Sequence, residues 1–95
     1  MTVAARSFYG LSSHHKWAFI GNKKYEQYLV ITVENNGGYL AFEITNMTTN
    51  KVEKLENPQS GTYEFLLGKG EKTQLVLKAK SAIGKYKIQK KTIKE

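Results

Sequence analysis

The sequence contains no cysteine, and it contains no aspartate either. The lack of cysteine excludes disulfide bonds, thiol nucleophiles and cysteine-ligated zinc sites. No stretch reaches the roughly 18 consecutive apolar residues that a membrane-spanning helix needs, and residues 1–16 lack the apolar core of a secretory signal. We therefore expect a cytoplasmic protein, or an extracellular or envelope protein if a signal peptide has been removed.

What the sequence does contain is enough apolar material for one folded domain. Its 95 residues are 40% hydrophobic and 12% aromatic, which suits one core and not two. Apolar and polar residues alternate in short segments between glycine and asparagine turns. This pattern predicts an all-β fold, a single antiparallel β-sandwich of about seven short strands, with a small β-barrel as the alternative. The expected strands cover residues 16–21, 25–34, 39–45, 51–55, 62–67, 73–80 and 85–93.

The same pattern predicts how the chain is divided and where it turns. Residues 1–15 show no clear period, so we expect a flexible N-terminal arm followed by the sandwich domain at 16–95. Asn36-Gly37 is a strong two-residue hairpin signal, because both positions tolerate a positive φ. The short connection 81–84 predicts a second hairpin, between strands 73–80 and 85–93.

The alternation also predicts which side chains face the core. We expect one face of each strand to be buried, and a register error of one residue would expose that face instead. The predicted core residues are Trp17, Phe19, Leu29, Ile31, Val33, Leu40, Phe42, Ile44, Tyr63, Phe65, Leu75, Leu77, Tyr86 and Ile88.

Catalytic and metal-binding patterns are few. The two histidines, His14 and His15, are adjacent, so on an extended chain they point to opposite faces and cannot easily share one metal or substrate. The segment 68–73 has glycines and a lysine but lacks the spacing of a phosphate-binding loop. We therefore expect no enzyme activity, no cofactor and no metal site.

Charge is the most distinctive feature of the sequence. The net charge is +7, and it lies wholly in residues 72–95, which carry eight lysines against one glutamate. On the predicted 73–93 hairpin, four lysines would share one exposed face, which makes them the candidate anion-binding residues: Lys78, Lys80, Lys85 and Lys87. Two interpretations stay open, because lysines on an exposed strand attract anions but also protect sheet edges from aggregation.

The segment SGTYEFLLGKGEKTQLVLKAKSAIGKYKI, residues 60–88, resembles the C-terminal half of small β-sandwich domains in Gram-positive secreted proteins and lipoproteins. It is also distantly similar to the bacterial pre-peptidase C-terminal domain. The resemblance implies a non-catalytic module of the bacterial cell envelope. The chain departs from those domains in having neither a lipobox cysteine nor early aspartates.

The sequence therefore predicts one preferred function and one alternative. The first is an envelope-associated accessory or binding module whose lysine-rich hairpin contacts an anionic polymer, lipid headgroups or an acidic protein. The alternative is a cytoplasmic or phage-encoded nucleic-acid-binding protein, in which exposed rings of Tyr25, Tyr28 and Tyr39 would stack on bases beside the lysines.

Overall fold

A computed structural model of the chain describes residues 2–93, and these residues form five β-strands and no helix. The strands are β1 (Thr2–Ile20), β2 (Glu26–Asn46), β3 (Val52–Glu56), β4 (Gly61–Leu67) and β5 (Lys72–Ile93). All pairings are antiparallel, and the order across the sheet is β1-β5-β2-β3, with β4 also paired to β2. Within the described residues, no helix has the length and apolar character to span a membrane.

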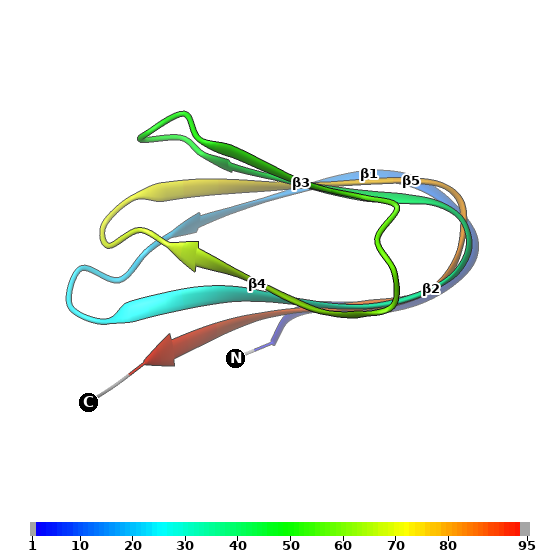
Figure 1. Ribbon diagram of the computed structural model, residues 1–95, viewed down its shortest axis with the longest axis horizontal. Coiled ribbons are helices and arrows are strands. Elements are labelled where there is room, and N and C mark those ends of the chain that lie inside the picture. Colours follow the sequence, from blue (N-terminus) through cyan, green and yellow to red (C-terminus); the bar gives the residue numbers. More distant parts are fainter. Residues whose placement is uncertain (1, 94–95) are drawn as a thin grey trace.

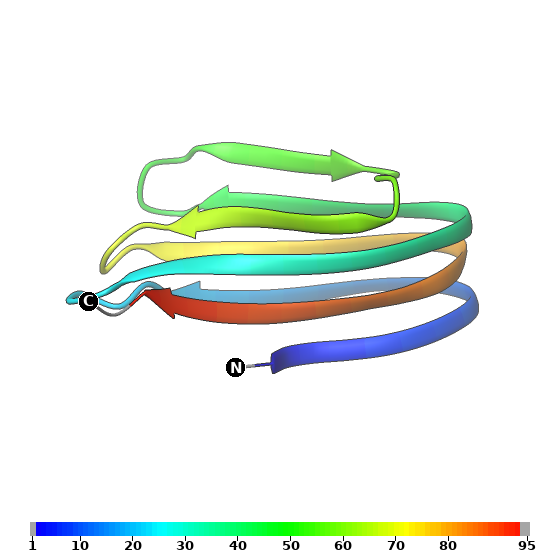
Figure 2. The same cartoon turned by 60° about the horizontal axis from the view of Figure 1, so that its bottom comes forward.

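Three of these strands are long, and each bends back over itself to build both layers of a sandwich (Figures 1 and 2). One layer, called the β3 layer here, contains residues 13–20, 72–80 and 39–46 together with β3. The other, called the β4 layer, contains residues 2–9, 83–93 and 26–35 together with β4. The short strands β3 and β4 pair with opposite halves of β2, so each layer has four strand segments.

Glycines make the sharp bends of β2 and β5 sterically feasible. Gly38 has a φ of 73°, and a Cβ added to it would lie 2.0 Å from the backbone oxygen of Ser81. Gly84 has a φ of 143°, and a Cβ there would lie 1.9 Å from the backbone oxygen of Glu34. The two bent backbones therefore lie against one another too closely for any side chain at these positions.

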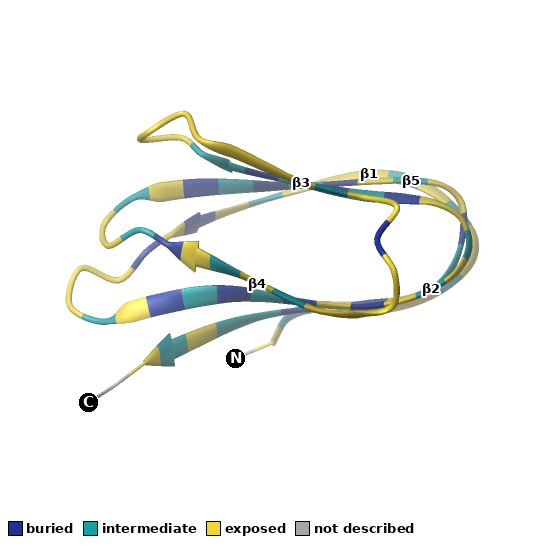
Figure 3. Ribbon diagram, viewed as in Figure 1, coloured by how far each residue is buried: buried dark blue, intermediate teal, exposed yellow. Residues whose placement is uncertain are grey.

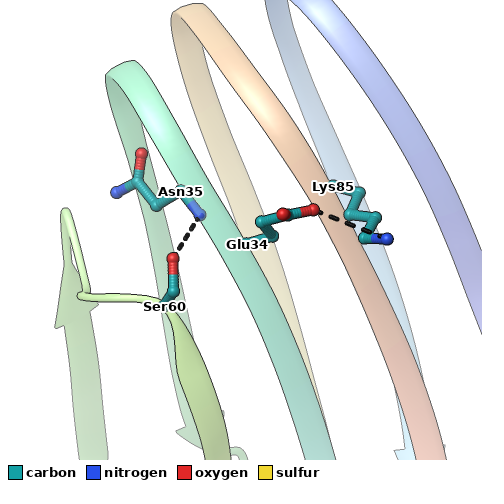
Figure 4. Close-up of polar contacts among 4 residues, drawn as sticks. All are labelled: Glu34, Asn35, Ser60 and Lys85. Atoms are coloured by element: carbon teal, nitrogen blue, oxygen red, sulfur yellow. Dashed lines mark hydrogen bonds and ion pairs between the residues drawn. The ribbon is translucent and has the colours of Figure 1, made fainter.

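The connection between β3 and β4 is also fixed at the bend. It crosses from one layer to the other, and the side chain of Asn35 holds it by donating to the backbone oxygen of Pro58 at 2.8 Å. The backbone N–H of Asn35 donates to the hydroxyl of Ser60 at 3.0 Å (Figure 4). The bend of β2 and this crossing loop are thus one hydrogen-bonded unit.

The core lies between the layers and follows the alternation of the strands, which Figure 3 shows as buried residues recurring along the ribbons of β2 and β5. Eleven of the fourteen predicted core residues are buried: Phe19, Leu29, Ile31, Val33, Leu40, Phe42, Ile44, Leu75, Leu77, Tyr86 and Ile88. Leu66 is 60% exposed, so the predicted strand register is confirmed. Trp17, Tyr63 and Phe65 are only partly buried, and all three lie on the edge strands β1 and β4. Leu67 and Ala82 complete the core.

The all-β antiparallel sandwich is thus confirmed, and the sheet is not closed into a barrel. The count of about seven short strands is wrong, because several predicted strands are halves of one long strand. Asn36-Gly37 does not make a hairpin: it lies in the bend of β2, and residues 26–35 and 39–46 belong to different layers.

The predicted N-terminal arm is also corrected. Residues 2–15 belong to β1 and pair with β5, from Thr2 opposite Gln89 to His15 opposite Leu77. These residues showed no clear period because β1 has register shifts between Thr2 and Ala4 and between Tyr9 and Ser13. Such irregularities move side chains between faces and hide the alternation of a strand.

Candidate anion-binding surface

The four candidate lysines all lie on β5, but the structure does not bring them to one face. The expected 73–93 hairpin is absent from β5, which runs unbroken through both layers and bends at residues 81–84. Lys78 and Lys80 therefore point outward from the β3 layer, whereas Lys85 and Lys87 point outward from the β4 layer. The prediction of a shared lysine face was wrong, because a strand that crosses between layers presents its outer sides in opposite directions.

On the β4 layer, acidic side chains accompany the lysines. Lys85 lies opposite Glu34, with Nζ 3.5 Å from the carboxylate (Figure 4), and Lys91 lies 4.0 Å from Glu64. These side chains are about half exposed or more, so the pairs add little stability. They do cancel much of the positive charge on this face. Lys87 is flanked by uncharged neighbours, Ala5 and Thr32.

On the outer face of the β3 layer, Glu43 lies opposite Val76 and diagonal to Lys78, but no lysine of β1 or β5 there forms an ion pair with a described residue. We call the four outward-facing lysines of β1 and β5 on this layer the basic strip: Lys16, Lys72, Lys78 and Lys80. Across the strands, Lys78 lies between His14 and Ala41, and Lys80 lies opposite Tyr39. None of the four lysines forms an ion pair with another described residue. The strip is therefore a set of exposed cations whose like charges repel one another.

The strip belongs to a wider separation of charge across the sheet. Between residues 2 and 93, every acidic residue lies on β2, β3 or β4 or in the turn before β5, and none lies on β1 or β5. Since β1 and β5 are neighbours at one side of the sheet, that side carries only positive charge. A one-sided distribution of this kind attracts anions over roughly a Debye length, about 8 Å at physiological salt.

The three tyrosines expected to stack on bases are scattered. Tyr39 lies on the outer face of the β3 layer beside Lys80, where partial burial and the nearby Glu56 carboxylate raise its pKa. Tyr28 lies on the β4 layer, opposite Lys91. Tyr25 precedes β2 and has the ammonium of Lys24 5.3 Å from its ring centre. Only Tyr39 therefore accompanies the basic strip.

The two histidines occupy opposite faces of β1. His14 lies outward beside Lys78, and His15 lies toward the layer interface, stacked on Trp17 with ring centres 5.8 Å apart. In the part of the chain that the structure describes, no group of three or more histidine or carboxylate side chains is arranged to hold a metal ion.

Lys16 and Lys72 are the two members of the strip that the sequence analysis did not identify. The place of Lys16 beside Val76 of β5 depends on the pairing of the first and last strands, which are separated by about half of the chain. One signal was available: the first 25 residues contain no acid, and neither do residues 72–93. No protein-family model matches this chain, and comparison with curated proteins gives no match either.

Proposed function

We propose that the protein is a non-catalytic binding module that holds a polyanion on the outer face of its β3 layer, through the basic strip. The observation that carries this proposal is the contrast between the two faces: Lys85 and Lys91 of the β4 layer form ion pairs with Glu34 and Glu64, whereas among the described residues no lysine of the strip lies within ion-pair distance of a carboxylate. The repulsion among the strip lysines would be relieved by a bound anion.

The partner expected from the sequence resemblance is an anionic polymer or lipid headgroup of a bacterial envelope, with an acidic protein as a further candidate. Exposed lysines act on such partners mainly as point charges. Binding should therefore be weak and should depend steeply on salt.

Two matched double variants test the proposal. Lys78→Gln/Lys80→Gln removes two charges from the strip, and Lys85→Gln/Lys87→Gln removes two charges from the same strand on the opposite face. Both variants have the same net charge. We expect the first to elute from a heparin-like column at clearly lower salt than the second, with a slope of log K against log salt reduced by about 1.5.

Thermal unfolding provides the folding control, since exposed substitutions of this kind change stability by only about 0.5 kcal/mol each. Equal losses of retention in the two variants would mean that net charge alone governs binding. Unchanged retention in the strip variant would contradict the proposal outright.

Nucleic acid is the second candidate, and the position of Tyr39 beside Lys80 is the observation that favours it. A single-stranded oligonucleotide would then use both groups. Tyr39→Leu should weaken oligonucleotide binding by about 1–3 kcal/mol if the ring stacks on a base, and it should leave heparin retention unchanged. If both ligands respond equally to Tyr39→Leu, base stacking does not contribute.

A further inference from the structure

The edge strand β1 has one side without a partner over its whole length. It spans 19 residues and pairs only with β5, so along its other side backbone N–H and C=O groups point away from the sheet. Natural sheets usually shorten such edges or place charges on them. Here the charged residues of β1 are Arg6 and Lys16 alone, so the edge is long and lightly protected.

The strands at the opposite edge of each layer, β3 and β4, run in the direction that allows antiparallel pairing with β1 of another copy. β1 and β2 are both antiparallel to β5, while β3 and β4 are antiparallel to β2. A second copy displaced sideways would therefore place its β3 antiparallel to β1 in one layer. The same displacement would place its β4 antiparallel to β1 in the other layer, so both layers could continue from copy to copy.

The edge strands β1 and β3 also carry complementary side chains on the outer face of the β3 layer: opposite charges and exposed apolar residues. On the outer face of the β3 layer, β1 presents Lys16 and the 65% exposed Ile20. On the same face, β3 presents Glu56 and the 47% exposed Val52. In each strand the two residues are four positions apart, so an antiparallel register that places Lys16 opposite Glu56 also places Ile20 opposite Val52.

We propose that this chain associates head to tail, with β1 of one copy pairing with β3 and β4 of the next. A symmetric pairing of two β1 edges would gain no such charge complementarity, because β1 carries no acid to place opposite Lys16 or Arg6. Head-to-tail contacts leave a free edge at each end, so association is open-ended. The contact joins β1 to strands of only five and seven residues, so it is weak and depends on protein concentration.

Substitutions that reverse the charges of Lys16 and Glu56 test the pairing. Association is measured by sedimentation at low salt, without any polyanion. Lys16→Glu and Glu56→Lys each place like charges at the contact, and each should shift the protein toward monomer at about 1 mM. The double variant Lys16→Glu/Glu56→Lys should regain association. An equimolar mixture of the two single variants should regain it too, because each then meets an opposite charge on the other.

If the double variant or the mixture regains association, Lys16 and Glu56 must meet between molecules and not within one. Lys16 and Glu56 lie on opposite edges of one layer, separated by β5 and β2, or roughly 14 Å at the usual strand spacing. Lys87→Glu, on the inner strand β5, makes the same charge change as Lys16→Glu away from both edges and should associate as the parent does. Parent protein that stays monomeric at about 1 mM would overturn the proposal, as would single variants that associate normally or a double variant that is not rescued.

Because no polyanion is present, failure of this test leaves the proposed anion binding unaffected. Conversely, a chain that associates but elutes early from a heparin-like column would retain the edge contact and lose the proposed function. The two proposals are therefore separable by experiment.

Discussion

Tyr86 is buried between the two layers and contacts aromatic rings from both. Its ring is 5.9 Å from that of Phe8, 6.3 Å from that of Trp17 and 6.1 Å from that of Phe42, measured between ring centres. The Trp17 and Phe42 rings meet it edge to face, an arrangement that adds stability beyond the buried area. Burial raises the pKa of Tyr86, and the Arg6 guanidinium partly opposes that shift.

This raised pKa predicts alkaline destabilisation. Since the pKa in the folded state exceeds the unfolded value of about 10, the contribution of Tyr86 to stability is fully present below about pH 10. It is lost as the pH rises through the folded pKa. Tyr86→Phe should therefore cost less than about 1.5 kcal/mol at neutral pH, because it conserves volume, and it should lose less stability than the parent between about pH 8 and pH 11.

Urea unfolding at the two pH values checks this prediction. Tyr9→Phe is the matched control, because the Tyr9 ring is 90% exposed and makes no part of the core. If Tyr86→Phe and the parent lose the same stability at high pH, ionisation of the buried ring does not contribute.

Which side of each strand is buried could be predicted from the sequence. Leu29, Ile31 and Val33 occupy every second position of β2, and burial follows that period of two because each strand has one face toward the other layer. The degree of burial could not be predicted for Trp17 and Phe65. Their exposure depends on whether a strand is at an edge, which is decided by pairing between distant segments.

At the scale of elements, the local sequence predicted hairpins where the structure has bends within the long strands β2 and β5. Gly37 and Gly38 have positive φ values, as a tight hairpin would also require. A hairpin and a bend between layers therefore share the same local signal. They differ in what lies beside the glycine, and at Gly38 that neighbour is Ser81, more than 40 residues away.

Replacement of a bend glycine should be far more costly than replacement of a strand glycine. Gly84→Ala would place a methyl group 1.9 Å from the backbone oxygen of Glu34 at an unfavourable φ, so we expect a loss of more than 1 kcal/mol. Gly61→Ala adds a methyl group with no atom within 4 Å, so its stability should change little or rise by about 0.4–1 kcal/mol. Thermal or urea unfolding compares the pair. Equal effects would show that the close approach of β2 and β5 does not constrain Gly84.

At the scale of the whole molecule, the sequence located the positive charge but not the surface that it forms. Lys78 and Lys80 are exposed as expected, yet their partner on the surface is Lys16 and not the Lys85–Lys87 pair. That arrangement depends on the bend of β5 and on its pairing with β1, and both are long-range outcomes of folding. Composition can therefore indicate an anion-binding protein without indicating which face would bind.

The passage of β1, β2 and β5 through both layers has a consequence for how the fold opens. Neither layer is a separate segment of chain, so breaking one layer separates the same three strands that hold the other. The two layers should therefore form one cooperative unit in native-state hydrogen exchange, with residues 39–46 and 26–35 of β2 opening at the same free energy.

The short edge strands β3 and β4, each paired along one side, should exchange by cheaper local openings. Clearly different opening energies for the two halves of β2 would contradict this expectation. If they agree, the sandwich has no stable half: neither layer persists once the other has opened, because the same three strands run through both.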